Sequence, residues 1–255
     1  MTNIPVGLQL YTVRELLAED PVTTIKAVAE IGYKGVEGGP PAGMSNRDYL
    51  ALLADCGLTL LGGGTSSTAM RTELAQIVDN CGELGINTLM TAIGRDLREN
   101  DNDWPRVVAE LGEVCAKAAA AGLRILYHNH AFEFETQVEG MYGLDYLFAT
   151  IPAAHIGAEL DTYWVHVGGE DPVAYINKYA DRMPYLHIKD RTPPPGDEAC
   201  PFAEVGHGLL GWGGIFAAAE AAGIEWYIVE QDRCTRPPLE SARLSFEFLK
   251  AQGVA

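Results

Sequence analysis

The chain contains 255 residues, of which 47% are hydrophobic, and its 35 acidic against 18 basic side chains give a formal net charge of −17. A chain of this length can bury a large core, either as one α/β barrel or as two smaller domains. The charge repels nucleic-acid phosphates, so we exclude nucleic acid as a partner and expect neutral substrates and metal cations. The five cysteines are odd in number and lack C-x-x-C spacing, which indicates neither a disulfide framework nor a cysteine zinc site.

Targeting and membrane segments are not indicated. No apolar run approaches the ~20 residues that a membrane-spanning helix requires. Residues 1–5, which precede the first apolar run, are too few for the regions of a secretory signal peptide. We therefore predict a cytoplasmic protein that makes no membrane contact.

A recurring unit organises the chain, consisting of an amphipathic stretch, a glycine and a short apolar run. The glycines suit the left-handed residue that ends a helix, and the apolar runs suit buried strands. In chain order, the predicted strands are 6–10, 35–37, 58–61, 88–92, 123–127, 156–160, 185–188 and 226–229. The predicted helices are 21–31, 45–56, 68–84, 103–121, 142–150, 172–181, 213–222 and 239–251.

Eight strand–helix pairs predict one closed (β/α)8 barrel, a TIM barrel, as a single domain over residues 1–255. An open, doubly wound sheet is the alternative architecture. No G-x-G-x-x-G phosphate loop follows the first strand, which weakens that alternative. The segment after the seventh strand, at about 191–214, is predicted to be a long loop, and loops of this length are usually functional.

Four of the predicted strands end in groups that can bind a metal. These are Tyr127-His128-Asn129-His130, Glu159-Leu160-Asp161, His187-Ile188-Lys189-Asp190 and Glu230-Gln231-Asp232. A parallel barrel brings the carboxyl ends of its strands to one mouth, so residues far apart in sequence become neighbours. The sequence therefore predicts a polar site at that mouth.

Each candidate also has a structural interpretation. A carboxylate that ends a buried strand, such as Asp161, is costly to desolvate without a cation or donors, although a lone aspartate there equally suits a helix cap. Glu159 lies two residues earlier on the same face, and Glu230 and Asp232 share a face in the same way. A lone histidine such as His187 is more often a core residue than a ligand. Several carboxylates with imidazole and no thiolate suit Mn²⁺, Mg²⁺, Co²⁺ or Zn²⁺.

An ordered set of motifs resembles a known family. The set consists of Leu8-Gln9-Leu10-Tyr11-Thr12-Val13-Arg14, Gly35-Val36-Glu37, Tyr127-His128-Asn129-His130-Ala131-Phe132-Glu133-Phe134, Glu159-Leu160-Asp161-Thr162-Tyr163-Trp164, His187-Ile188-Lys189-Asp190, Glu204-Val205-Gly206-His207-Gly208 and Val229-Glu230-Gln231-Asp232. Together these motifs resemble the sugar phosphate isomerase/epimerase family of xylose isomerase-like TIM barrels. The resemblance runs from residue 6 to about 250 and identifies the superfamily rather than a substrate.

This resemblance implies one divalent metal ion, with Mn²⁺ favoured over Mg²⁺, Co²⁺ or Zn²⁺. The implied ligands from strands five to eight are Glu133, Asp161, His187 and Glu230. In many members the strand-five ligand is a glutamate within the strand, and by spacing His128 takes that place here. Glu133 and His128 are therefore alternative ligands, and we favour Glu133.

The resemblance also implies a mechanism in which the metal bridges the carbonyl and adjacent hydroxyl of a keto sugar and stabilises a cis-enediolate. Glu133 would act as the base and Glu230 as the acid. Lys189 would stabilise oxyanion charge, and His130 would hold a hydroxyl at the reacting centre. Further substrate contacts are expected from Tyr11, Glu37, His128, Trp164, Glu204 and Trp212. For any one aromatic in this set, core packing is the simpler interpretation.

Three activities fit such a site. We predict an isomerase or epimerase that acts on a keto sugar or polyol. The alternative is a lyase that eliminates water or another β-leaving group from a 3-keto sugar, keto-glycoside or inosose. A non-catalytic sugar-binding barrel is the third, less favoured because unused clustered carboxylates cost stability. The expected partner is a small sugar or polyol, and barrels of this kind commonly form homo-oligomers.

Overall fold

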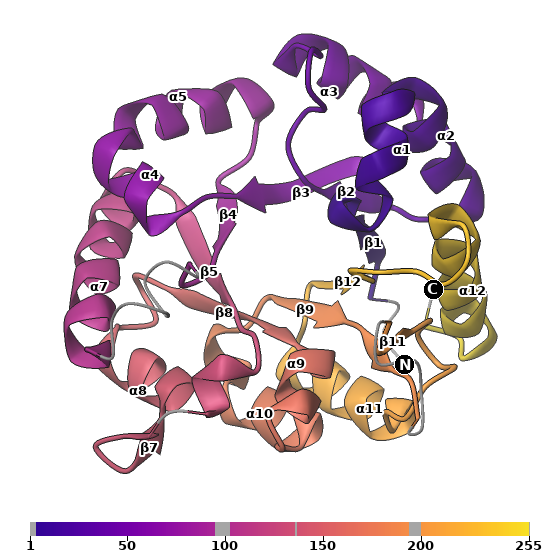
Figure 1. Cartoon of the computed structure of the whole chain (residues 1–255). Coiled ribbons are helices and arrows are strands. Elements are labelled where there is room, and N and C mark those ends of the chain that lie inside the picture. Colours follow the sequence, from indigo (N-terminus) through magenta and orange to yellow (C-terminus); the bar gives the residue numbers. More distant parts are fainter. Residues whose placement is uncertain (1–3, 95–102, 136, 194–199, 255) are drawn as a thin grey trace.

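Eight parallel strands form a closed barrel surrounded by helices (Figure 1). The computed structural model describes residues 4–94, 103–135, 137–193 and 200–254. Around the ring, neighbouring strands follow the order β1, β12, β9, β8, β5, β4, β3 and β2. Their bounds are β1 (Val6–Gln9), β2 (Gly35–Glu37), β3 (Thr59–Gly64), β4 (Thr88–Thr91), β5 (Arg124–His128), β8 (Gly157–Asp161), β9 (Tyr185–Ile188) and β12 (Trp226–Val229). The predicted (β/α)8 architecture is confirmed.

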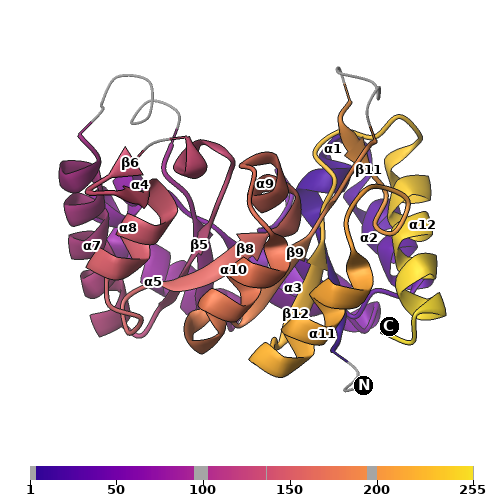
Figure 2. The same cartoon turned by 90° about the horizontal axis from the view of Figure 1, so that it is seen from below.

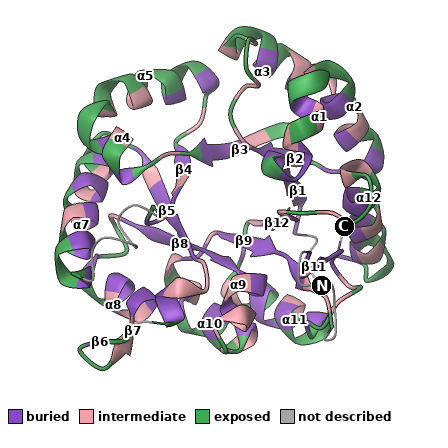
Figure 3. Ribbon diagram, viewed as in Figure 1, coloured by how far each residue is buried: buried purple, intermediate pink, exposed green. Residues whose placement is uncertain are grey.

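Helices cover the outside of the barrel, with their inward faces buried and their outward faces exposed (Figure 3). They are α1 (Arg14–Glu19), α2 (Pro21–Ile31), α3 (Asn46–Asp55), α4 (Ser67–Thr72), α5 (Leu74–Leu84), α7 (Trp104–Ala120), α8 (Gly143–Thr150), α9 (Thr162–Val167), α10 (Pro172–Lys178), α11 (Trp212–Ala222) and α12 (Pro238–Ala251). Short 3-10 turns are η1 (Leu10–Val13), η2 (Phe132–Phe134) and η3 (Ala180–Arg182). Among the described residues, no helix combines the length and apolar composition that a bilayer crossing requires.

The ends of the helices follow the predicted local signals. Asp20 accepts a hydrogen bond from the Thr23 amide and precedes a proline at the first position of α2. Gly85 and Gly223 end α5 and α11 with φ angles of 66° and 71°, a left-handed conformation that glycine adopts without strain. Two predicted helices differ, because 68–84 is divided at Glu73 into α4 and α5, and 172–181 is divided at Tyr179 into α10 and η3.

β3 is longer than predicted because it continues through Gly62, Gly63 and Gly64. A Cβ atom at Gly62 would lie 2.8 Å from the carbonyl oxygen of Thr88, so a side chain at this position would displace β4. The glycines therefore allow the backbones of two neighbouring strands to approach closely.

Two small antiparallel ribbons stand outside the barrel, β6 (Gln137–Val138) with β7 (Met141–Tyr142) and β10 (Asp190–Arg191) with β11 (Phe202–Ala203). The second ribbon falls within the predicted loop 191–214, of which residues 194–199 lie outside the described residues. It projects above the barrel at the carboxyl ends of the strands (Figure 2). We call this end the mouth and the opposite end the base.

Candidate metal centre and its cavity

The alternation of side chains along the strands builds the inside of the barrel. Ala158 and Leu160 of β8 face the helices and join the main core, whereas Glu159 and Asp161 face inward. A separate apolar cluster of Leu61, Leu126, Tyr185 and Ile228, from four strands, fills the lower interior. Polar side chains occupy the next positions toward the mouth. The barrel interior thus contains apolar side chains toward the base and ionisable side chains toward the mouth.

Four of these side chains form a group whose donor atoms lie within 4.8 Å of one another, namely His128, Asp161, His187 and Glu230. All four are buried. His187 Nδ1 lies 3.1 Å from Glu230 Oε2, and His128 Nε2 lies 3.9 Å from Asp161 Oδ2. Two imidazoles and two carboxylates are a donor set that suits a borderline divalent ion. This group can therefore bind a metal.

Asp161 serves two purposes at once. Its Oδ1 accepts a hydrogen bond from the Trp164 amide and caps α9, so the cap interpretation holds. Its backbone N–H donates to Asn129 Oδ1, at 2.9 Å, which positions the residue from the neighbouring strand. Its Oδ2 lies 3.0 Å from the Lys189 ammonium, whereas Nδ1 of His128 is buried without a hydrogen-bond partner among the described residues. A buried imidazole nitrogen without a partner is costly, and Asp161 offers a carboxylate oxygen to the metal-binding group, where it would bind a divalent ion.

A second acidic pair lies beneath the first group and shares His187 with it. Glu37 and Glu159 are both fully buried, and each offers an oxygen to His187 Nε2, at 3.0 and 3.5 Å. Gln9 donates to Glu37 at 2.5 Å, whereas neither oxygen of Glu159 has a hydrogen bond. His187 thus presents Nε2 to this pair and Nδ1 to Glu230, the arrangement in which carboxylates orient a metal-binding imidazole.

Lys189 is the cation within the mouth. Its buried Nζ lies 3.0 Å from Asp161 Oδ2, 2.8 Å from Glu230 Oε2 and 3.0 Å from Asp232 Oδ2. Burial opposes the charge of Lys189, but these three carboxylates outweigh burial and raise its pKa. The ammonium is therefore permanently charged and compensates part of the acidic cluster.

The pKa values of the acidic residues separate into two classes. Burial raises the pKa of Glu159 to about 8, with a further contribution from Glu37, and raises that of Asp161 to about 6. Burial also opposes ionisation of Glu230, yet Lys189 and His187 outweigh it and hold the pKa of Glu230 well below its usual value. Burial, followed by the neighbouring His187, lowers the pKa of His128 well below its usual value. A neutral imidazole is the form that binds metals.

Glu133, the ligand favoured from sequence, lies outside this group. Its Oε1 accepts a hydrogen bond from the Tyr127 hydroxyl and its Oε2 accepts one from the His130 amide, both at 2.8 Å. The side chain is fully buried. It therefore supports the turn η2 beside the site, while His128 reaches the metal-binding group.

A cavity of about 750 Å³ opens at the mouth beside this group. It is lined by Tyr11, Arg14, Met90, Ala92, His128, His130, Tyr163, Trp164, Pro201, Phe202, Glu230, Asp232 and Arg233. Of the predicted substrate contacts, Tyr11, His128 and Trp164 line it, as does His130. The two arginines were not predicted, because nothing in either local segment marks a residue that faces the mouth.

Three predicted substrate contacts lie elsewhere. Glu37 is buried beneath the cavity against Gln9 and His187. Glu204 accepts a hydrogen bond from Ser241 at 2.8 Å and pairs with Arg236 at 3.3 Å, outside the cavity. The third is Trp212, whose indole N–H donates to Asp190 Oδ2. Their positions in the motifs predicted that these three residues contact a substrate at the mouth. In the structure, the polar group of each forms a hydrogen bond or an ion pair with another residue of the protein.

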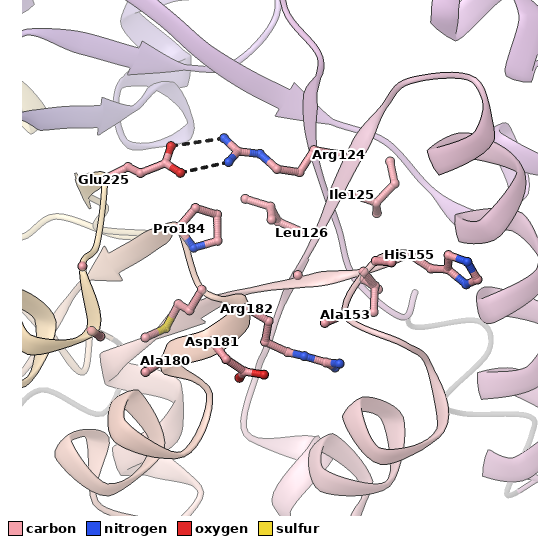
Figure 4. Close-up of a pocket in the computed structure, with 16 residues that line it drawn as sticks. Arg124, Ile125, Leu126, Ala153, His155, Ala180, Asp181, Arg182, Pro184 and Glu225 are labelled. Atoms are coloured by element: carbon pink, nitrogen blue, oxygen red, sulfur yellow. Dashed lines mark hydrogen bonds and ion pairs between the residues drawn. The ribbon is translucent and has the colours of Figure 1, made fainter.

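A smaller cavity of about 310 Å³ lies at the base, between the starts of β5, β8, β9 and β12. There the Arg124 guanidinium faces Glu225, with nitrogen–oxygen distances of 3.1 and 3.4 Å (Figure 4). Arg182 donates to the backbone carbonyls of Phe148 and Ile151. The two arginines at the base thus have protein partners, which favours the mouth as the functional end.

Comparison with known proteins agrees with this geometry. A family model described as xylose isomerase-like TIM barrel matches residues 25–252. The chain belongs to this family. Its matched segment includes β2 to β12 and all four residues of the metal-binding group.

Individual relatives have low sequence identity to this chain. An inosose dehydratase from Lacticaseibacillus casei is 28% identical over 167 residues, which is 59% of this chain and 55% of the relative, so the chain spans about half the length of the curated relatives it matches. A sugar phosphate isomerase/epimerase from Parabacteroides distasonis superposes with a TM-score of 0.82 at 24% identity, covering 98% and 95% of the two chains. The IOLI protein, crystallised with a zinc atom, gives a TM-score of 0.74 at 14% identity over 98% of each chain. The TM-scores establish a shared fold, and at identities this low the solved structures establish nothing beyond the fold.

Proposed function

We propose that this protein is a divalent-metal-dependent enzyme that acts on a keto sugar or a related cyclic polyol. The observation that carries the proposal is the buried group of His128, Asp161, His187 and Glu230, which opens onto a cavity large enough for a monosaccharide. Relatives named for sugar and inosose chemistry support the same substrate class. The net charge of −17 further disfavours nucleic acid as a partner.

We assign the four ligands to His128, Asp161, His187 and Glu230, with His128 in place of Glu133. The reason is that Glu133 uses both carboxylate oxygens in hydrogen bonds within the protein, whereas His128 lies in the group and has an unsatisfied ring nitrogen. We propose Mn²⁺ as the ion, since hard carboxylates and neutral imidazoles accept it, and Zn²⁺ as the alternative with the same donors.

When bound, a divalent ion here would polarise the carbonyl of the substrate and make the neighbouring C–H bond more acidic. His130 lies at the cavity wall, 5.2 Å from His128 and 5.4 Å from Trp164 between ring centroids, and is placed to move the proton. Lys189 Nζ would donate to the developing oxyanion from its position between Asp161 and Glu230. Trp164 and Phe202 form an apolar wall that limits water access.

We favour elimination of water as the outcome, so that the enzyme would be a carbon–oxygen lyase. In this reaction the proton leaves the carbon beside the carbonyl, its electron pair forms a carbon–carbon double bond, and the β-hydroxyl departs with a proton as water. The support is the similarity to inosose dehydratases. Isomerisation or epimerisation is the second candidate, supported by the structural similarity to the Parabacteroides protein. Both outcomes begin with the same proton abstraction.

The test is to incubate the Mn²⁺-loaded protein in heavy water with inososes, 3-keto sugars and common ketoses, and to follow the products by NMR. Loss of water from a substrate supports the lyase. Deuterium uptake with a shifted carbonyl or an inverted centre supports the isomerase or epimerase. If no substrate exchanges deuterium although the protein retains Mn²⁺, the enzymatic proposal is wrong and the barrel is a binding protein.

A further inference from the structure

We propose that Asp190 is a positioning residue for the mouth of the barrel. Its carboxylate holds residues 204–212 beside the β10–β11 ribbon, so that Phe202 covers the Lys189 ammonium and forms part of the cavity wall. This inference rests on the proposed function, because Lys189 and that wall belong to the proposed site. It also assigns a role to two motifs that the metal-binding group does not use, the aspartate of His187-Ile188-Lys189-Asp190 and the sequence Glu204-Val205-Gly206-His207-Gly208.

The Asp190 carboxylate is fully buried and accepts five hydrogen bonds from within the protein. The donors, at 2.8 to 3.1 Å, are the backbone amides of Arg191, Gly206, Gly208 and Leu210 and the indole N–H of Trp212. Two carboxylate oxygens offer about four lone-pair sites, so this group has no capacity left for a ligand. The role of Asp190 is therefore to organise the segment that surrounds it.

The segment 204–212 fits closely around this carboxylate. A Cβ atom at Gly208 would lie 2.3 Å from Asp190 Oδ1 and 2.4 Å from the carbonyl oxygen of Arg191, so only glycine allows the approach. On its other side the segment is tied to α12, because the Val205 amide donates to Ser245 Oγ at 3.0 Å. Asp190 and α12 thus fix the segment from two directions.

The β10–β11 ribbon connects Asp190 to the wall of the cavity. β10 begins at Asp190 and pairs with β11, which carries Phe202. The Phe202 ring packs against Tyr163 at 4.6 Å and Trp164 at 6.1 Å between ring centroids. Lys189 Nζ lies 5.8 Å from the centre of the Phe202 ring and 5.6 Å from that of Trp164. Aromatic rings at these distances attract an ammonium group and shield it from water.

The expected consequence of losing Asp190 is a change at Lys189 and not at the metal-binding group. A displaced ribbon would move Phe202 away from the ammonium and admit water, and a donor stabilises an oxyanion less well in water than in a dry site. The metal-binding group depends on other contacts, because Asn129 positions Asp161 and Glu37 contacts His187. Asp190 should therefore affect turnover and leave metal affinity unchanged.

The test is ¹⁹F NMR of the full-length protein labelled with 5-fluorotryptophan, which gives one resonance for each of Trp104, Trp164, Trp212 and Trp226. Asp190→Asn keeps one acceptor oxygen and turns an NH2 group toward N–H donors, so the Trp212 and Trp164 resonances should both shift. Trp212→Phe removes one donor and keeps an aromatic ring, so it should shift the Trp164 resonance in the same direction by less. An unchanged Trp164 resonance in D190N, or in W212F if D190N fails to fold, would overturn the proposal.

A Phe202→Leu variant tests whether the effect passes through the wall. In this background, D190N should move the Trp164 resonance by less than about half of its effect in the native protein, because the ring contact is already lost. An undiminished effect would mean that Asp190 acts on Trp164 by another route, and the proposal would be wrong.

The matched control is Arg124→Met, which removes hydrogen bonds at the base and should leave the Trp164 resonance at its native position. A shift as large as that in D190N would show that a general loss of stability moves this resonance, which also overturns the proposal.

Activity provides a separate measurement on any substrate that the heavy-water assay identifies. D190N should lower kcat by about 10- to 100-fold, with Mn²⁺ affinity within about twofold of the native value. A native kcat together with a shifted Trp164 resonance would contradict the role in catalysis. The NMR measurements need neither metal nor substrate, so they test the positioning of the wall even if the proposed function fails.

Discussion

The mouth and the base of the barrel both gather charged side chains, and they differ in how those charges are paired. At the base, Arg124 contacts Glu225, Thr88 and Tyr185, and the guanidinium of Arg182 donates to two backbone carbonyls. At the mouth, acidic groups outnumber the basic ones, and both oxygens of Glu159 lack hydrogen bonds within the described part of the chain. A buried acidic cluster with incomplete pairing lowers the stability of the fold, so its presence indicates a role in ligand binding. Charged side chains with protein partners, as at the base, indicate a role in stability.

The largest expected effect is on metal retention. Replacing Asp161 by Asn removes a ligand charge, and we expect Mn²⁺ affinity to fall by ~100-fold or more, with activity lost in proportion. Mn²⁺ content after dialysis and Mn²⁺ titration measure this. Glu225→Gln at the base is the control and should keep native affinity. If both variants bind Mn²⁺ like the native protein, the difference between the two ends has another origin.

The next effect distinguishes the two candidates for the strand-five ligand. His128→Ala should lower Mn²⁺ affinity by roughly 10- to 100-fold, since it removes a donor of the metal-binding group. Glu133→Gln should change it much less, but should destabilise the protein by about 1–3 kcal/mol because an amide cannot accept both present hydrogen bonds. Metal titration and denaturant unfolding separate the two effects. The opposite pattern would restore Glu133 as the ligand.

At the base we expect an effect on stability alone. Arg124→Met removes the hydrogen bonds to Thr88, Tyr185 and Glu225, and should lower the free energy of unfolding by about 1–2 kcal/mol, limited because the ion pair is partly exposed. Urea unfolding gives this value. Mn²⁺ affinity should stay native, and a change in it would show that the two ends are coupled through the interior.

The smallest effect is a pH dependence of the chelator-treated protein. The pKa values of Glu159, about 8, and Asp161, about 6, exceed their ordinary values of 4.5 and 3.8. The folded state then binds these protons more tightly than the unfolded state, so stability falls as pH rises between the unfolded and folded values. His187, with its pKa raised above 6.5, adds stability that is complete below pH 6.5 and is lost at higher pH.

Glu230 does not oppose this trend, because its lowered pKa contributes stability that is already complete above about pH 4.5 and is lost only in acid. His128 acts in the opposite sense below pH 6.5, because its lowered pKa adds stability as pH rises toward that value. We therefore expect the Tm in chelator to fall by about 5 °C from pH 6.5 to pH 8. Added Mn²⁺ should reduce the fall, because it binds the deprotonated carboxylates. A Tm that stays constant in chelator would mean that ionisation of the mouth carboxylates does not lower the stability of the folded protein.

Much of the fold could be predicted from local patterns. The glycine after each amphipathic stretch, as at Gly85 and Gly223, and the proline after Asp20 marked helix ends that the structure reproduces. The strands were recognisable because parallel barrel strands are buried on both faces and read as continuous apolar runs. The long third strand was underestimated, since three consecutive glycines resemble a turn until the close backbone of β4 is known.

The site was predictable where the polar group ended a strand directly. Asp161, His187 and Glu230 meet because register and the two-residue alternation of strands leave them few alternatives. Glu133 followed a strand by several residues, and in such a turn the spacing does not determine which side chain reaches inward. The role of Trp212 was also beyond local patterns, because its partner Asp190 lies at the start of the same long connection.

By itself the sequence determined the repeated strand and helix units, the barrel and the identity of the acidic and imidazole groups at its mouth, because these follow from short-range periodicity and residue chemistry. Only the tertiary structure decided that His128 joins the metal-binding group, that Glu37 lies beneath it, and that Arg14 and Arg233 line one cavity. The physical reason is ring closure. It places β1 beside β12 and so brings together residues from the two ends of the chain, a contact that no local pattern encodes.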